Sequence, residues 1–129
     1  MTTMLYLAYS FETTAHAQAN PDAFWAWMAD RHAWFYNGLD MVRATSWRTE
    51  SRPTSQLIHH EVAFDDERGL AGYRAVLAAR GRDPGWEARR RSQDTWYTIV
   101  SRSVQVSPPV PMTTGQHPDP AEEGALPIA

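Results

Sequence analysis

The stretch 56–64 constrains the fold of this chain more than any other. Its sequence, Gln-Leu-Ile-His-His-Glu-Val-Ala-Phe, has the alternating character of a strand. Successive side chains of a strand point to opposite faces. His60 therefore shares its face with three apolar residues, namely Ile58, Val62 and Phe64. We expect a strand whose histidine looks into packed side chains, and we expect the chemistry of the protein near it.

The segments around this strand carry patterns typical of further strands and helices. Strands are predicted at 5–11, 40–52 and 95–106, and helices at 20–37, 65–81 and from 83 to 91. Residues 12–19 are expected to form a polar connection. Asn20 and Asp83, each followed by proline, are expected to cap helices with their side chains. This order of elements predicts an α+β, ferredoxin-like βαββαβ fold, with a four-stranded antiparallel sheet and helices on one face.

Length and composition indicate one domain followed by a tail. We place the domain at 1–106 of the 129 residues, and the tail at 107–129, which holds six of the nine prolines. The tail is expected to be disordered or to wrap around a partner subunit. The chain has no cysteine, no secretory signal pattern and no run near the ~20 apolar residues of a membrane span. We therefore expect a cytoplasmic protein without a membrane partner.

The charge balance argues against nucleic acid as a partner. Three of the fifteen acidic residues lie in 107–129, which leaves twelve acidic and twelve basic residues in 1–106. A neutral domain lacks the basic surface that phosphate binding requires.

The helix-free face of the predicted sheet is expected to be apolar, because aromatic or aliphatic residues fall on several strands in either register. An apolar face of that size must be covered. A second copy packed sheet against sheet covers it most simply, so we predict a homodimer.

The strand 57–62, the acidic helix start at 65–67 and the turn Asp83-Pro84-Gly85-Trp86-Glu87 together resemble the dimeric α/β-barrel superfamily. The resemblance is to its NIPSNAP-like and antibiotic-biosynthesis-monooxygenase-like branches, and covers about 4–106 as topology. It implies a small, mostly apolar pocket between helices and sheet, often without metal or organic cofactor. Members include cofactor-independent oxygenases, polyketide cyclases, isomerases and proteins with no demonstrated activity. They often carry an aromatic residue where this chain has Glu61.

His60 is the first catalytic candidate. An imidazole among apolar side chains has its charged form disfavoured, so it could act as a neutral base. The alternative is a core histidine that is simply hydrogen-bonded.

His59 and Glu61 share the opposite face of the strand. The carboxylate could orient the imidazole for catalysis, or the two could form a surface or interface pair. With His16 or His32 they would make a metal-binding set, but no spacing requires this, and our prediction has no metal and no cofactor.

Several other residues are candidates for contact with a flat ligand. His32, Trp25 and Tyr36 lie on one edge of the apolar arc of the helix at 20–37, which is wider than a surface helix needs. Trp47 is expected beside the histidine strand, and Arg43 could stabilise an enolate or phenolate. Glu61 completes the substrate-binding candidates, and His32 is also a catalytic candidate. The alternative for each is a core, boundary or interface position.

Two functions fit these patterns. The first is a cofactor-independent enzyme of specialised, antibiotic- or polyketide-type metabolism, acting on an aromatic or polycyclic small molecule. His60 or His59 would remove a proton, as oxygenation, cyclisation and isomerisation all require at the outset. The second is a non-catalytic small-molecule-binding or accessory protein on the same fold.

Overall fold

A four-stranded antiparallel sheet organises the computed structural model, which describes residues 4–110 and 112. The strands lie in the order β2-β3-β1-β4, so the histidine strand β3 is next to both the N-terminal strand and the β2 hairpin partner. Their bounds are β1 Leu5–Thr13, β2 Ala44–Ser51, β3 Gln56–Phe64 and β4 Tyr97–Val106. This topology is that of the ferredoxin-like fold, which confirms the predicted fold class.

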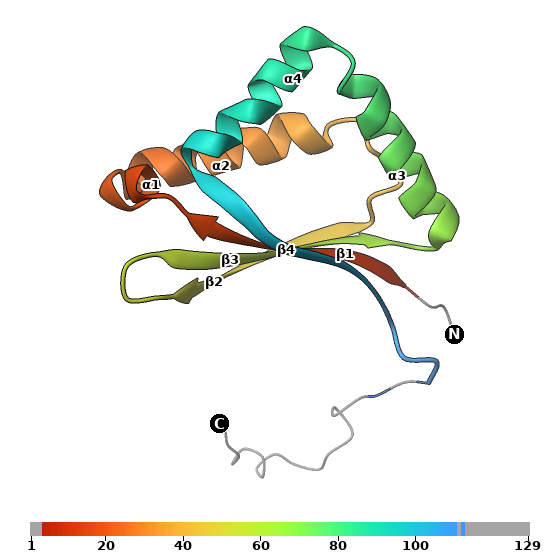
Figure 1. Cartoon of the computed structure of the whole chain (residues 1–129). Coiled ribbons are helices and arrows are strands. Elements are labelled where there is room, and N and C mark those ends of the chain that lie inside the picture. Colours follow the sequence, from red (N-terminus) through yellow and green to blue (C-terminus); the bar gives the residue numbers. More distant parts are fainter. Residues whose placement is uncertain (1–3, 111, 113–129) are drawn as a thin grey trace.

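The long helices lie on one side of the sheet, as Figure 1 shows. The helical segments are α1 Ala15–Ala19, α2 Pro21–Tyr36, α3 Glu67–Arg80, α4 Pro84–Arg91 and the 3-10 turn η1 Ser92–Thr95. Two apolar clusters fill the layer between sheet and helices. Leu7 and Phe35 belong to one, Phe11 and Phe24 belong to the other, and Tyr9 packs against both. Within the described part of the chain, no helix combines the length and apolar character that crossing a bilayer requires.

Two of the predicted helix starts are confirmed by side-chain caps. Asp66 accepts a hydrogen bond from the Gly69 N–H at 2.9 Å. The capping role predicted for Asn20 is wrong, because the connection expected at 12–19 contains helix α1. Asn20 ends that helix, and its side-chain amide donates to the His16 carbonyl at 2.9 Å. Asp83 does cap α4, by accepting from the Gly85 N–H at 3.0 Å.

A β-bulge in β4 changes which of its side chains face the helices. Ser10 pairs with Ser101 but Phe11 pairs with Ile99, so Val100 is the extra residue. Strict alternation of side chains along the predicted strand at 95–106 places Arg102 and Ile99 on opposite faces of the sheet. That prediction is wrong, because the bulge brings both to the helix side, where they line the same cavity.

The helix-free face of the sheet, which we call the open face, is more polar than predicted. The registers place Ser10, His59, Arg48 and Ser101 side by side across its four strands. The expectation of an apolar open face is therefore wrong at its centre. The large exposed apolar side chains of the sheet lie instead on the edge strand β4, at Ile99, Val100, Val104 and Val106.

The predicted tail 107–129 falls mostly outside the described residues. Within its described part, the Ser107 N–H donates to the Met4 carbonyl at 3.0 Å.

The caps of α3 generate a test of this architecture. Asp66→Ala removes the acceptor for the Gly69 N–H and should lower the free energy of unfolding by about 1 kcal/mol. Asp65→Ala is the matched control, because Asp65 makes an exposed ion pair with Arg43 and should cost less than ~0.5 kcal/mol. Urea unfolding of both variants measures the difference. Equal losses would contradict the assigned cap.

Candidate functional site

A cavity of about 210 Å³ lies between the sheet and the helices. Its walls come from β1, β3, β4, α2, α3 and the α4–η1 segment. The cavity therefore forms only when the sheet and these helices have packed together. We call it the helix–sheet cavity. Its lining residues are Tyr9, Phe11, Arg31, Phe35, Tyr36, His60, Tyr73, Leu77, Arg90, Gln93, Tyr97, Ile99 and Arg102.

His60 lies in the wall of this cavity and is 2% exposed, as its face of the strand predicted. Its Nδ1 is 2.9 Å from the Ser46 carbonyl oxygen, and its Nε2 is 2.6 Å from the Tyr36 hydroxyl. A carbonyl can only accept, so Nδ1 carries the proton and the neutral Nε2 accepts from Tyr36. Burial lowers the pKa of His60 to about 4, and the positive charge of Arg31 acts in the same direction. The imidazole is therefore neutral near pH 7.

Trp47 stacks directly on the His60 ring. The ring centroids are 3.5 Å apart and the planes meet at 15°. The two residues are direct partners in the β2–β3 hairpin, so the register sets this contact. Trp47 thus covers one side of the imidazole and keeps its plane fixed.

Tyr36 comes from the last turn of α2, and its hydroxyl is hydrogen-bonded to His60 Nε2. Burial raises its pKa well above the usual value, and Tyr73 adds to this effect. Tyr36 therefore stays protonated and acts as a hydrogen-bond donor. Because its proton points to His60, its oxygen remains an acceptor toward the cavity.

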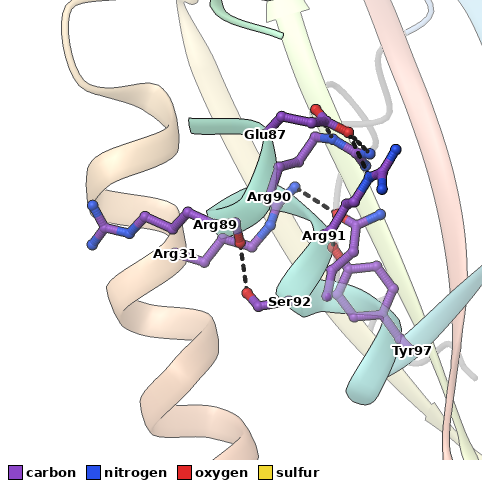
Figure 2. A network of polar contacts seen from close by, with 8 residues as sticks. Arg31, Glu87, Arg89, Arg90, Arg91, Ser92 and Tyr97 are labelled. Atoms are coloured by element: carbon purple, nitrogen blue, oxygen red, sulfur yellow. Dashed lines mark hydrogen bonds and ion pairs between the residues drawn. The ribbon is translucent and has the colours of Figure 1, made fainter. Parts of the chain in front are cut away.

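Arg31 is a further polar residue of the cavity wall, and it is 8% exposed. Figure 2 shows its side chain leaving α2 toward the α4–η1 segment, where its Nη2 donates to the Gln93 Oε1 at 3.2 Å. The guanidinium lies 4.2 Å from the centre of the Phe35 ring. Its Nε has no hydrogen-bond partner within the described residues.

The cavity lining is positively charged. Besides Arg31 it includes Arg90 and Arg102, while no described lining residue is an aspartate or glutamate. Arg90 is neutralised by Glu87 just outside, at 2.6 Å (Figure 2), and this contact lowers the pKa of Glu87 to about 2. The arrangement suits a ligand that is negatively charged or becomes so.

Two predicted residues lie at a different hollow. Trp25 and His32 line a space of about 400 Å³ beside α2, with Trp47 between it and the imidazole of His60. Burial lowers the pKa of His32, and Arg31 adds to this effect. The sequence analysis grouped Trp25 and His32 with Tyr36, but Trp47 separates their hollow from the imidazole of His60.

His59 and Glu61 lie on the open face, across the sheet from His60. His59 Nε2 is 3.0 Å from Glu50 Oε1, and its Nδ1 is 3.2 Å from Ser10 Oγ. Glu50, not Glu61, is therefore its carboxylate partner. Within 4–110 and 112, no three histidine, aspartate or glutamate side chains gather as a metal site would require.

Arg43 lies away from the helix–sheet cavity. Its guanidinium pairs with Asp65 at 2.7 Å, at the end of the sheet where both side chains are exposed. The anion-stabilising role considered for Arg43 is therefore available to Arg31 and Arg102, which the sequence analysis did not select. A signal for Arg31 existed, because Phe24, Met28, Arg31 and Phe35 form one buried stripe in which it is the charged member.

Comparisons with known proteins agree with this architecture. No family model and no curated protein matches the chain. HapK from Hahella chejuensis is 12% identical over 86% of this chain and 99% of its own, with a TM-score of 0.57. A NIPSNAP-like domain protein from Burkholderia xenovorans is 17% identical over 84% and 91%, with a TM-score of 0.52.

SnoaB, a cofactor-independent oxygenase from Streptomyces nogalater, is 11% identical over 88% of this chain and 98% of its own, with a TM-score of 0.52. At these identities the likeness concerns the fold. It confirms the fold that the predicted resemblance implied.

The low pKa of His60 predicts a specific pH dependence of stability. Between about pH 4 and pH 6.5 the unfolded chain binds a proton at this residue that the folded chain does not. Stability should therefore fall as the pH drops through this range, by roughly 3 kcal/mol. His60→Gln should show a correspondingly shallower fall in urea unfolding at pH 7 and 4.5, whereas the control His59→Gln should not. An unchanged slope in His60→Gln would contradict the buried neutral imidazole.

Proposed function

We propose that this protein is a cofactor-independent enzyme that acts on an aromatic small molecule by removing a proton through His60. The observation that carries the proposal is a neutral imidazole in the wall of a cavity, hydrogen-bonded to Tyr36 and accompanied by arginines. A neutral base, a directed proton path and positive charge for the resulting anion are what such a step requires.

Tyr36 connects the cavity to the imidazole. A proton released by the substrate would pass to the Tyr36 oxygen while the tyrosine proton transfers to His60 Nε2 across the 2.6 Å hydrogen bond. The Ser46 carbonyl then continues to hold the Nδ1 proton, which keeps the ring oriented. His60 is thereby the proton acceptor, and Tyr36 is the group that contacts the substrate.

The low basicity of His60 makes anion stabilisation necessary. Transfer from an acid with a pKa of about 10, such as a phenol, to a base with a pKa of about 4 is uphill by about 8 kcal/mol. Arg31 and Arg102 would lower this difference by stabilising the enolate or phenolate in a water-poor site. We therefore assign the anion-binding role to the arginines.

The fold comparisons support the reaction class without identifying the substrate. SnoaB, which has the same fold, is a cofactor-independent oxygenase. A place in specialised, antibiotic- or polyketide-type metabolism accords with that neighbour. Whether the carbanion formed next meets oxygen, cyclises or is reprotonated depends on the substrate.

The reaction can be tested before the substrate is known. Exchange of carbon-bound acidic protons for deuterium from the solvent, measured by NMR on a panel of aromatic ketones and 1,3-diketones, reports proton removal directly, because hydroxyl protons exchange with water without a catalyst. His60→Gln should slow this exchange by about 10²- to 10⁴-fold. His59→Gln, on the opposite face, should keep the rate within a few-fold. Equal exchange by His60→Gln and the unaltered protein would disprove the role of His60.

A second candidate is a non-catalytic binding protein that uses the same cavity. Both nitrogens of His60 already have partners within the fold, and its low pKa makes it a weak base, which favours this alternative. Ligand binding without deuterium exchange on any member of the panel would support it.

We also propose that the protein is a homodimer. The exposed apolar side chains of β4 include Val100 at 52%, Val104 at 46% and Val106 at 60% exposure. Neighbouring exposed valines on an edge strand are a surface that a second copy would cover. The second copy would then cover the edge strand β4.

Sedimentation of two variants tests the dimer. Val104→Glu combined with Val106→Glu places two charges in the proposed interface and should shift the protein toward the monomer. Thr49→Glu on β2, at the opposite edge of the sheet, is the control and should sediment like the unaltered protein. A monomeric unaltered protein, or a valine variant that stays dimeric, would contradict the proposal.

A further inference from the structure

Arg31 occupies a position that folding alone does not favour. It lies on the buried stripe of α2, where the neighbouring inward positions are Phe24, Met28 and Phe35. Moving a guanidinium out of water is costly unless a carboxylate and further hydrogen bonds replace the lost hydration. Within the described chain, no acidic side chain forms an ion pair with Arg31, and its hydrogen bond is to the neutral amide of Gln93.

The guanidinium also retains hydrogen-bonding capacity. It has five N–H donors in a fixed plane. The bond to Gln93 uses one, and Nε is buried without an acceptor among the residues described. Buried donors of this kind in native proteins call for an explanation, and an absent acceptor is one. Arg31 lines the helix–sheet cavity, so a ligand bound there can supply an acceptor to its guanidinium.

Gln93 and Tyr97 hold the arginine in place. The Gln93 Oε1 accepts from both Arg31 Nη2 and the Tyr97 hydroxyl, each at 3.2 Å. The Phe35 ring covers one face of the guanidinium at 4.2 Å. Arg31 is therefore preorganised, which lowers the entropic cost of binding.

The rest of the cavity limits the kind of ligand. Phe11 and Tyr97 form a stacked pair 4.4 Å apart in its wall, which suits a flat ring. The volume of about 210 Å³ is below the roughly 300–1,000 Å³ typical of pockets for drug-sized ligands. A single ring with one small substituent fits this size better than a polycyclic ligand.

We propose that the helix–sheet cavity binds a small monocyclic aromatic acid, with Arg31 as the residue that recognises its carboxylate. Planar guanidinium groups bind carboxylates through two parallel hydrogen bonds, and the pairing restores the missing counter-charge. The ring lies against the aromatic wall, with its far end toward Tyr36 and His60. This inference rests on the proposed function for the identity of the reacting end, but the binding itself does not depend on catalysis.

Benzoate and benzamide are the probes, because they share shape and size and differ in charge. Calorimetry at constant ionic strength should show that the unaltered protein binds benzoate at least about tenfold more tightly than benzamide. Arg31→Met should weaken benzoate binding by about tenfold or more and leave benzamide unchanged. It should also fold, because methionine is apolar and comparably long.

Two further variants make the result specific to Arg31. Arg89→Met is the matched control, because Arg89 is exposed and covers Trp34 outside the cavity, and it should bind benzoate like the unaltered protein. Arg31→Lys keeps the charge without the planar fork and should bind benzoate with intermediate affinity. If Arg31→Met fails to fold, this variant carries the test.

Several outcomes would overturn the inference. They are absence of benzoate binding, equal affinity for benzoate and benzamide, and full benzoate affinity in Arg31→Met or Arg31→Lys. His60→Gln separates the two proposals. If it keeps the preference for benzoate but does not alter deuterium exchange, the catalytic role fails and the carboxylate site stands. If it abolishes exchange while the preference is absent from the unaltered protein, the carboxylate site fails and the catalytic role stands.

Discussion

The burial of one imidazole connects the main parts of this fold. His60 on β3 is hydrogen-bonded to Tyr36 on α2 and to the Ser46 carbonyl on β2. Its ring also stacks on Trp47, which is on β2 as well. A buried polar ring must have both nitrogens satisfied or lose free energy on folding. The helix end and the hairpin register are thus tied to a single group. These contacts keep the imidazole oriented toward the cavity, and its burial keeps it neutral.

The cavity combines two features that oppose stability and favour function. Burying Arg31 is costly because its guanidinium stays charged and has no carboxylate partner among the described residues, and burying His60 is costly because it disfavours the protonated imidazole. Natural proteins tend to retain such groups at sites that act on other molecules. Arg31, His60 and Tyr36 all line the helix–sheet cavity. The free-energy costs of burying the first two therefore fall where a bound ligand can offset them.

The distribution of apolar surface shows how a single extra residue alters a sheet. The bulge at Val100 shifts the alternation of β4, which brings Arg102 into the cavity and leaves Val104 and Val106 beside each other at the edge. The open face meanwhile receives serines and the His59–Glu50 pair. One irregularity in β4 therefore sets which of its side chains face the cavity.

The sequence alone determined the topology, the orientation of His60, the acidic start of the helix at 65–67 and the cap at Asp83, because these depend on local periodicity and on neighbours close in the chain. It also placed Tyr36 and Trp47 among the candidates. The tertiary structure decided which candidates meet. Arg43 turns away from the cavity, and Arg31 and Arg102 enter it, because pairing partners far apart in the chain, such as Gln93, and a bulge without a composition signal set those positions. Local patterns carry no information on such long-range choices.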